Sequence, residues 1–398
     1  MGDRFEAIVG AEHVSRPEAQ TLCGARVEAI VRPASAVEVA ACLRAASESG
    51  IAVVPVGGGS KLGFGNPLDT PACIQLELGR IQEHARLDPD EGVAELDTGV
   101  PLEALARSAA ALGKTTLLDP LHAGATVGGA IAVDPVSPEA SLDARLRNEL
   151  LGLEVALANG ELTRSGGRVV KNVTGFDLVR LYCGSFGALG VITRAIVRLR
   201  AAPERVTVTR ARFASPGSAL EAFAQAAFSG PTAATALVAA DGGAELLFRF
   251  AGGAAEVDAQ RTAAPGDPVE LDAWSRLRAQ LARPPVCGSA RVRLGARPSD
   301  VAVLCRGLAA AAGERALELA LPRAGIVFGR VETRALAEVA AFAERASATF
   351  ALERAPGAEP VACDAFGAPP PALALMRALK TRFDPARVLS PGRFVAGI

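Results

Sequence analysis

Glycine-containing turns are concentrated between Asp119 and Arg200, and they constrain the fold more than any other feature of this sequence. Four of these turns lie between β-branched or apolar runs: Gly128-Gly129, Asn159-Gly160, Gly166-Gly167 and Gly184 to Gly190. Glycine allows the backbone to take positive φ angles and to approach a ligand closely. Because so many such turns occur so near one another, we expect a large flat ligand that is held mainly by the main chain.

Length and composition limit the classes of protein that this chain can belong to. The chain has 398 residues, of which 50% are hydrophobic, so it is long enough for two or three domains with buried cores. Its 42 basic and 43 acidic residues are interspersed and only 4% of residues are aromatic, so no nucleic-acid-binding surface is expected. No apolar stretch has the length of a membrane span, and the N-terminus lacks the apolar core of a secretory signal.

The cysteines and histidines indicate a cytoplasmic protein without a metal centre of its own. The seven cysteines are scattered, odd in number and form no Cys-x-x-Cys pair. This pattern is typical of reduced thiols and does not indicate an iron–sulfur cluster or a structural zinc within the chain. Only three histidines are present, His13, His84 and His122, so we expect no histidine-rich metal site.

In the first half of the chain, helices of modest length alternate with strands. Residues Ala36–Ser49 are amphipathic and end at Gly50, which predicts a helix, and Ile51–Val56 predicts a short buried strand. We also expect strands at Cys73–Leu76 and Val93–Leu96, helices at Leu102–Leu112 and Phe176–Tyr182, and further strands between Leu150 and Arg200. The alternation favours the α+β or the mixed α/β class.

After Ala202-Pro203 the sequence becomes alanine-rich. Helix-like segments occur at Ser218–Phe228, Leu271–Leu281, Pro298–Ala312 and Thr333–Ser347, and strand-like runs at Val206–Arg212, Glu245–Phe250, Ala290–Leu294 and Ala324–Phe328. We interpret this region as a ferredoxin-like α+β domain with helices on one face of an antiparallel sheet. No repeat of fixed period is evident. A helix and a proline-containing turn close the chain.

A glycine-rich turn, Gly57 to Ser60, follows the first predicted strand and precedes Lys61. Successive amides in such a turn form a nest that can bind a pyrophosphate, although an ordinary tight turn has the same composition. Leu62 stands where the third glycine of a Rossmann fingerprint would be, so the turn is not of that type.

Two short motifs are similar to those of other enzyme classes. Ala111–Thr116 ends like a nucleotide-triphosphatase loop, but Ser108 stands where that pattern requires a glycine, so we interpret Gly113 as the cap of a helix. The run from Cys183 to Gly187 is similar to the nucleophile elbow of a serine hydrolase, but Cys183 replaces its first glycine. Neither enzyme class is expected.

Four blocks in order resemble one family. They are VPVGGGSKLGFGNP at Val54–Pro67, DPLHAGATVGGAIA at Asp119–Ala132, GGRVVKNVTGFDLVRLYCGSFGALGVIT at Gly166–Thr193 and FDPARVLSPGRF at Phe383–Phe394. This order resembles the PCMH-type FAD-binding domain of the vanillyl-alcohol oxidase superfamily, and among its members the FAD-binding E subunits of bacterial glycolate oxidase. The resemblance implies an α+β fold. It comprises a two-subdomain PCMH-type FAD-binding domain at 1–203, a ferredoxin-like α+β substrate or interaction domain at 204–370, and a C-terminal helix and tail at 371–398 that returns to the FAD site.

The resemblance also implies which residues bind FAD. The pyrophosphate loop would consist of Gly57, Gly58, Gly59 and Ser60, with Lys61 beside it. The residues against the isoalloxazine ring and the pyrophosphate would be Pro120, Gly124, Ala125, Thr126, Val127, Gly128 and Gly129. The site would be completed by Lys171, Asn172, Gly184, Gly187, Gly190, Val191 and Ile192. Some members carry a loop histidine that bonds covalently to the flavin. This loop has none, so we expect non-covalent FAD.

The sequence offers only candidates for the catalytic groups. His122 lies where the resembled E subunits often have a histidine, although a lone histidine is more often structural than catalytic. Arg393 is a candidate to offset negative charge on reduced flavin or to bind a substrate carboxylate, and an ordinary surface arginine is the alternative. Arg291, Arg293 and Arg323 are further candidates for a carboxylate clamp.

The absence of any histidine after His122 separates this chain from family members related to the glycolate oxidase D subunit, which carry an H-x-G-D-G-N-x-H motif in the second domain. The resemblance therefore implies an FAD-binding oxidoreductase subunit of a glycolate (2-hydroxy acid) oxidase or dehydrogenase complex, which takes part in flavin-mediated oxidation and electron transfer. The implied partners are a second FAD subunit and an iron–sulfur subunit, in the cytoplasm or at the inner membrane through those partners.

Two alternatives stay open. The first is a self-sufficient FAD-dependent 2-hydroxy acid or alcohol dehydrogenase whose base is an Asp, a Glu, Tyr182 or a water. The second is a non-catalytic assembly subunit with a vestigial flavin site.

Overall fold

The computed structural model describes residues 3–139, 145–168, 176–226, 233–240, 242–355, 361 and 363–398. They form two compact units. The first comprises Met1–Pro135, Leu146–Ala201 and Pro369–Ile398, and the second comprises Val136–Arg145 and Ala202–Ala368. The short segment Val136–Arg145 therefore belongs to the second unit, although it lies within the first domain expected from the sequence.

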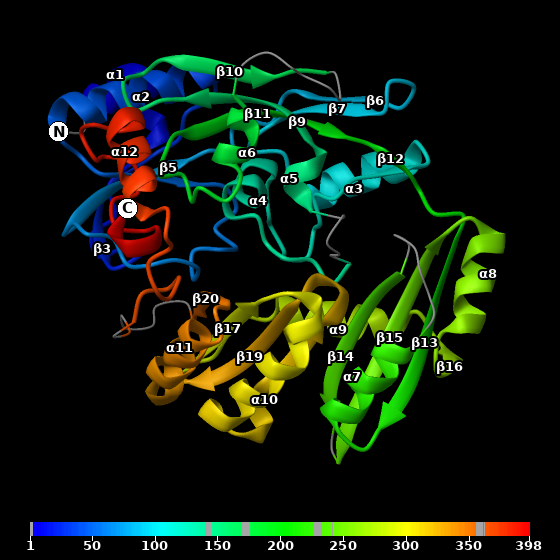
Figure 1. Ribbon diagram of the computed structural model, residues 1–398. Helices are drawn as coiled ribbons and strands as arrows, with labels where there is room; N and C mark the ends of the chain where they lie inside the picture. Colours follow the sequence, from blue (N-terminus) through cyan, green and yellow to red (C-terminus); the bar gives the residue numbers. More distant parts are fainter. Residues whose placement is uncertain are drawn as a thin grey trace. The chain divides into compact units, whose positions relative to one another are not determined.

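The first unit contains most of the elements of the N-terminal half (Figure 1). Its helices are α1 (Asp3–Val9), α2 (Ala36–Ser49), α3 (Leu102–Ala111), α4 (Val127–Val133), α5 (Leu146–Glu149), α6 (Leu178–Tyr182) and α12 (Leu373–Phe383). Its strands are β1 (Val14–Ser15), β2 (Thr21–Leu22), β3 (Ala25–Val31), β4 (Val53–Val56), β5 (Ala72–Glu77), β6 (Ala85–Asp88), β7 (Val93–Asp97), β8 (Lys114–Thr115), β9 (Leu150–Ala156), β10 (Leu162–Gly166), β11 (Val191–Arg198) and β12 (Arg200–Ala201).

Two five-stranded sheets organise this unit. One has the order β1-β3-β5-β4, with β2 also paired to β3, and its strands β3, β5 and β4 are parallel. The other is antiparallel, in the order β10-β9-β11-β7-β6, and all seven residues of its strand β9 are buried. Helix α2 makes the crossover from β3 to β4. The Ser35 side chain caps its first turn and Gly50 ends it at φ 64°.

The end of the chain joins the first of these sheets. Leu389 forms a parallel bridge with Val53 at the start of β4, and the Ser390 amide donates to the Val53 carbonyl over 2.9 Å. In Figure 1 the C-terminal residues (red) accordingly lie beside N-terminal elements (blue). Residues more than 300 positions apart in the sequence therefore meet next to β4.

The second unit is built on one eight-stranded antiparallel sheet. Its strands are β13 (Arg205–Phe213), β14 (Ala233–Ala240), β15 (Gly243–Gly252), β16 (Asp267–Val269), β17 (Ser289–Gly295), β18 (Leu317–Leu321), β19 (Ile326–Glu332) and β20 (Thr349–Arg354), in the order β16-β13-β15-β14-β18-β19-β17-β20. Its helices are α7 (Pro216–Gln225), α8 (Ala254–Ala263), α9 (Asp272–Ala282), α10 (Val301–Ala312) and α11 (Leu336–Arg345). One buried core combines residues of the sheet with residues of α7, α8, α10 and α11.

This unit consists of two ferredoxin-like halves of the same topology. Each half runs strand–helix–strand–strand–helix–strand, and corresponding elements start 82 to 85 residues apart. The halves meet where β14 pairs with β18, with Leu237 opposite Ala320. The α+β class and the ferredoxin-like architecture expected from the sequence are confirmed. The duplication is a repeat of topology that the sequence did not reveal.

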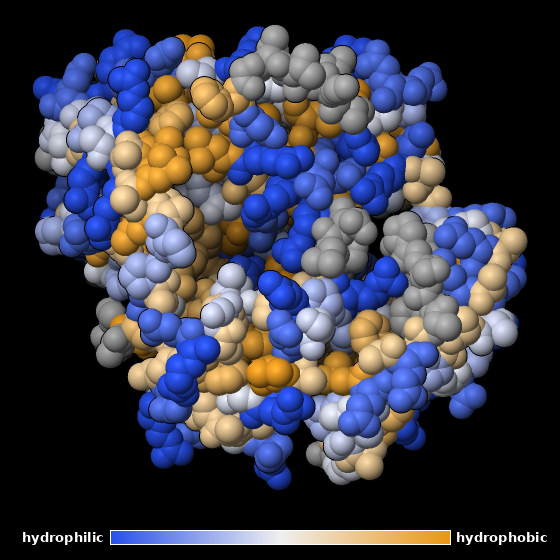
Figure 2. All heavy atoms as spheres, viewed as in Figure 1, coloured by the Kyte–Doolittle hydropathy of each residue, from blue (hydrophilic) through white to orange (hydrophobic). Residues whose placement is uncertain are grey.

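Among the described residues, none of the helices is both long and apolar enough to cross a bilayer. The seven cysteines all lie within the described residues, and none of them forms a disulfide there. Figure 2 shows apolar side chains gathered beside the part of the surface where Figure 1 places α12. On that helix only Lys380 is buried, and Leu375 is 63% exposed.

Candidate functional site

A hollow of about 650 Å³, counted with the space that opens to solvent, lies in the first unit at the end of β4. The residues that line it come from four segments distant in the sequence: Val54 to Leu62; Thr126, Gly129, Ala132 and Val133; Phe186 and Gly187; and Ser390 and Arg393. The blocks that suggested a ligand site in the sequence are thus brought together by the fold.

The turn from Gly57 to Ser60 forms the first wall. It begins directly after β4, and Gly59 takes φ 72°. Within the described part of the chain, none of the four amides from Gly57 to Ser60 donates a hydrogen bond to a protein acceptor. Consecutive unbonded amides in a turn that passes through the left-handed region make a nest for an anion.

The segment from Gly124 to Gly129 forms the second wall and packs tightly against this turn. A Cβ on Gly57 would lie 2.1 Å from the Thr126 Oγ1 atom, and one on Gly58 would lie 1.6 Å from the Gly124 carbonyl oxygen. Side chains at these positions would force the two walls apart. Thr126 also caps α4, because its hydroxyl oxygen accepts from the Gly129 amide at 3.4 Å.

The third wall contains strained backbone. Phe186 has φ 56° and Ser390 has φ 44°, although neither is glycine. A non-glycine residue in this region costs about 1–3 kcal/mol, and such residues cluster at ligand sites. The Phe186 ring stacks on the Phe394 ring with centroids 5.6 Å apart, so the turn and the C-terminal tail support each other here.

Charge at the hollow favours an anion. Lys61 and Arg393 are among its lining residues, and the described lining contains no carboxylate. Arg393 is 5% exposed, and its guanidinium donates to three carbonyls of the segment after the nest: Leu62 at 3.3 Å, Phe64 at 2.5 Å and Asn66 at 2.8 Å. Arg393 therefore holds this segment in place. Its action on flavin or on a substrate carboxylate stays a prediction.

Only part of the predicted cofactor-binding set lines the hollow. The predicted residues that line it are Gly57, Gly58, Gly59, Ser60, Lys61, Thr126, Gly129, Gly187 and Arg393. The predicted residues that are not among its lining residues are Pro120, Gly124, Ala125, Val127, Gly128, Gly184, Gly190, Val191 and Ile192. Lys171 and Asn172 lie outside the described residues.

Several residues of this second set are engaged within the unit itself. Ala125, Val127 and Ile192 are buried in the core of the unit. The amides of Val127 and Gly128 donate to the carbonyls of Val100 and Thr98, at 3.0 and 2.9 Å. These two amides are therefore already satisfied within the protein.

Several lining residues were not singled out from the sequence: Val54, Pro55, Val56, Leu62, Ala132, Val133, Phe186 and Ser390. All stand within or next to the recognised blocks. The only sequence signal that could have marked them as lining residues was their position beside a glycine turn. Most of them are apolar, and in the sequence they resemble ordinary core residues. They give the hollow apolar surface on which flat rings can pack.

The candidate bases and nucleophiles lie away from the hollow. His122 is 8% exposed and Tyr182 is 1% exposed, and neither is a lining residue. Burial raises the pKa of the Tyr182 hydroxyl, so it is protonated at neutral pH. Burial, together with the charge of Asp134, raises the pKa of the Cys183 thiol to about 12, so this thiol is protonated at neutral pH. Gly113 has φ 65° just after α3, which confirms it as a helix cap.

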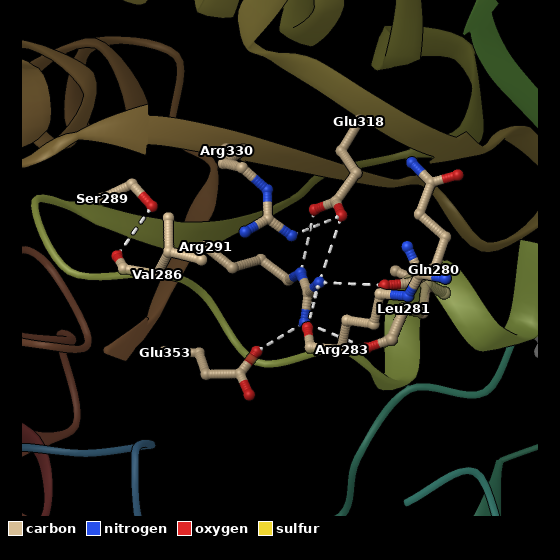
Figure 3. A network of polar contacts seen from close by, with 9 residues as sticks. All are labelled: Gln280, Leu281, Arg283, Val286, Ser289, Arg291, Glu318, Arg330 and Glu353. Atoms are coloured by element: carbon tan, nitrogen blue, oxygen red, sulfur yellow. Dashed lines mark hydrogen bonds and ion pairs between the residues drawn. The ribbon is translucent and has the colours of Figure 1, made fainter. Parts of the chain in front are cut away.

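In the second unit, Arg291 is held in a buried polar network (Figure 3). Its guanidinium pairs with Glu318 through two hydrogen bonds, at 2.9 and 3.1 Å, and donates to Glu353 at 2.8 Å. Arg330 also donates to Glu318, at 3.0 Å. The remaining donors of Arg291 cap the end of α9 by binding the carbonyls of Gln280, Leu281 and Arg283.

This network removes Arg291 from the candidate carboxylate clamps. A guanidinium has five N–H donors. In Arg291 all of them point at these carboxylates and carbonyls, so none is left for a substrate. The roles suggested for Arg293 and Arg323 stay predictions.

The residues of the hollow fit a dinucleotide with a flat ring system. Unbonded amides and two cations suit a diphosphate, and the apolar lining suits adenine and a tricyclic ring. Because Gly57 and Gly58 have no side chain, the two walls close on each other and the amides remain exposed to the ligand.

Comparisons with known proteins agree with this fit. A family model described as "FAD binding domain" matches residues 27–166. D-lactate dehydrogenase from Archaeoglobus fulgidus is 38% identical over 173 residues, which are 43% of this chain and 38% of that protein. Glycolate oxidase subunit GlcD from Bacillus subtilis is 32% identical over 44% of this chain and 38% of its own length. Subunit GlcE from Escherichia coli is 32% identical over 48% of this chain and 55% of its own length.

The matches thus cover less than two thirds of the length of these relatives. Among solved structures, p-cresol methylhydroxylase has a TM-score of 0.72 at 16% identity, over 98% of this chain and 95% of that one. A structure of alkyldihydroxyacetonephosphate synthase has a TM-score of 0.70 at 15% identity, over 98% of this chain and 84% of that one. At these identities the likeness establishes the fold. The prediction is confirmed: this chain is a flavoprotein with a PCMH-type fold, has FAD as its cofactor and is related to glycolate oxidase subunits and D-lactate dehydrogenases.

Proposed function

We propose that this chain is the FAD-binding subunit of a glycolate (2-hydroxy acid) oxidase or dehydrogenase complex and that it depends on partner subunits for turnover. One observation carries the proposal: the described lining of the hollow has groups suited to binding FAD, but it has no side chain suited to act as the general base. It contains Lys61, Arg393 and three hydroxyl side chains, and no His, Asp, Glu or Tyr. Oxidation of a 2-hydroxy acid requires a group that takes the hydroxyl proton.

The sequence of the second unit supports the same proposal. The whole chain has no histidine after His122, and Arg291 is fully engaged within the protein. FAD when bound supplies the two-electron acceptor, and the chain's own residues bind it and set its position. The proposed partners are a second FAD subunit and an iron–sulfur subunit, since relatives of this chain are named as subunits of glycolate oxidase. We place the complex in the cytoplasm, or at the inner membrane through its partners.

The test is an anaerobic absorption spectrum of the purified chain with non-covalently bound FAD, recorded before and after addition of glycolate or D-lactate. The proposal predicts a flavin spectrum that does not bleach with either substrate. Acid precipitation should release all of the flavin into the supernatant, because the loop lacks a histidine for a covalent bond.

Two outcomes would contradict the proposal. Bleaching of the isolated chain by either acid would show a self-sufficient dehydrogenase, with a base outside the described lining. A chain that binds FAD but never bleaches, even when supplied with the partner subunits of a working complex, would be a non-catalytic assembly subunit.

A further inference from the structure

The C-terminal segment contains a buried ion pair that has no role in the FAD binding or the catalysis described above. Lys380 on α12 is 5% exposed and Asp384, just after the helix, is 0% exposed. The Lys380 Nζ atom lies 2.7 Å from Asp384 Oδ2. An ammonium is rarely buried unless all of its donors are satisfied, because its desolvation is costly.

The other two donors of Lys380 reach two segments that are distant in the sequence and that both line the hollow. Nζ donates to the Ala188 carbonyl at 2.9 Å and to the Leu389 carbonyl at 2.7 Å. Ala188 follows the lining residue Gly187, and Leu389 precedes the lining residue Ser390. One ammonium thus connects the glycine turn of the third wall with the C-terminal tail.

Asp384 completes the connection from the other side. Its carboxylate accepts from the amides of Val388, at 3.0 Å, and Leu389, at 2.8 Å. The same stretch of tail is paired with β4: the Val53 amide donates to the Val388 carbonyl at 2.7 Å, and the Ser390 amide donates to the Val53 carbonyl at 2.9 Å. β4 leads directly into the amide nest.

We propose that Lys380 is a positioning residue for FAD, because its ammonium holds the turn from Gly184 to Gly190 against the C-terminal tail and so completes the hollow. The hollow is then formed only while the tail is docked. FAD binding and tail docking are linked, and each stabilises the other. This inference rests on FAD as the cofactor and does not depend on the proposed substrate or partners.

Linkage is reciprocal, which gives the proposal two independent readouts. If docking of the C-terminal tail raises the affinity for FAD by some factor, then bound FAD must raise the equilibrium constant for docking of the tail by the same factor. Such couplings are typically about 5- to 150-fold. If Lys380 only stabilised the fold, its replacement would lower the free energy of unfolding without either effect.

The main variant is Lys380→Met, which keeps the length of the side chain and removes its charge and donors. The control is Leu105→Ala, because Leu105 is 2% exposed on α3, belongs to the same unit and does not line the hollow. We expect Lys380→Met to raise the Kd for FAD about tenfold or more, whereas Leu105→Ala, at a comparable loss of stability, leaves it within about twofold. Since Lys380→Met leaves Asp384 as an uncompensated buried charge, the double variant Lys380→Met/Asp384→Asn provides a neutral pair if the single variant does not fold.

Hydrogen exchange supplies the second readout. In the unmodified chain and in Leu105→Ala, FAD should slow hydrogen exchange at the amides of Val388, Leu389 and Ser390. In the Lys380 variants, FAD should no longer slow exchange at these amides. Equal slowing by FAD in all of them, or a Kd for the Lys380 variants no higher than that of the control, would overturn the proposal. Either result would leave FAD binding itself and the spectral test of the proposed function unaffected.

Discussion

Replacement of Gly59 by alanine tests whether the unbonded amides hold FAD. Gly59 takes φ 72°, and a Cβ placed on it would meet only the Leu62 Cδ1 atom, at an ordinary 3.6 Å. The substitution therefore creates no steric clash. It adds only the conformational penalty of a left-handed alanine, about 1–2 kcal/mol. We expect the loop of the Gly59→Ala apoprotein to relieve this strain by leaving the positive-φ region, so that its amides no longer point toward one common anion.

Binding of FAD must restore the converging conformation, so the whole penalty falls on the affinity. Since about 1.4 kcal/mol corresponds to a factor of ten, the Kd for FAD should rise about 5- to 30-fold. The assay is a titration of the apoprotein with FAD, followed by quenching of flavin fluorescence. Urea unfolding of the apoprotein should show little loss of stability, because the relaxed loop is not strained.

Gly113→Ala is the matched control. Gly113 takes φ 65° in the same unit, and no atom of the described residues lies within 4 Å of an added Cβ. Its strain is the same with and without FAD, because it caps α3 and does not line the hollow. It should therefore lower the free energy of unfolding by about 1–2 kcal/mol and leave the Kd unchanged. An unchanged Kd in Gly59→Ala, or an equal rise in both variants, would refute the assignment of the nest.

Two further predictions concern the second unit and the thiols. Burial alone would raise the pKa of Glu318, but its hydrogen bond and charge interaction with Arg291 lower it below the ordinary value. Glu318→Leu should therefore cost about 3–5 kcal/mol of unfolding free energy at neutral pH. The cost should shrink below about pH 4, because there the unfolded chain takes up a proton at Glu318 before the folded chain does. The exposed pair of Glu332 with Arg334 provides the control, and equal urea midpoints for Glu318→Leu and Glu332→Leu would contradict the prediction. Iodoacetamide at neutral pH should label the exposed Cys287 and spare Cys183, whose pKa is about 12, as read by peptide mass spectrometry; rapid labelling of Cys183 would show that its burial is wrong.

The local elements of the first unit could be predicted well from the sequence because local signals determine them. The helix expected at Ala36–Ser49 is α2 residue for residue, since its N-cap serine and its C-terminal glycine lie next to it in the chain. The strand expected at Ile51–Val56 is β4, two residues shorter at its start. The helix expected at Phe176–Tyr182 begins at Leu178, where the Asp177 side chain caps it.

The sequence was less informative in the second unit because alanine obscured the strands. β14, with the sequence AATALVAA, is dominated by a good helix former and was not predicted as a strand. It is a strand because β15 pairs with it on one side and β18 on the other. Such pairing overrides intrinsic propensity. Without β14 and β18 the two halves could not be recognised as copies of one topology.

The cofactor site shows the same limit at the level of single residues. Glycine marks a place where backbones come close, but the sequence does not say whether the close neighbour is the ligand or the protein itself. Gly128 illustrates this: a Cβ there would lie 1.7 Å from the Thr98 Oγ1 atom, and its amide is bonded to the Thr98 carbonyl. A variant such as Gly128→Val would thus disturb packing within the unit.

The contrast between Gly59 and Gly128 shows what distinguishes a ligand-binding glycine from a packing one in this protein. Gly59 combines positive φ with an amide that has no acceptor among the described residues, and an added Cβ would make only an ordinary contact with Leu62. Gly128 has a bonded amide and a filled Cβ position. Close approach accounts for both, but only an unbonded amide has a donor left for a phosphate. The binding residues of the nest therefore follow from where the backbone hydrogen bonds go, which only the fold reveals.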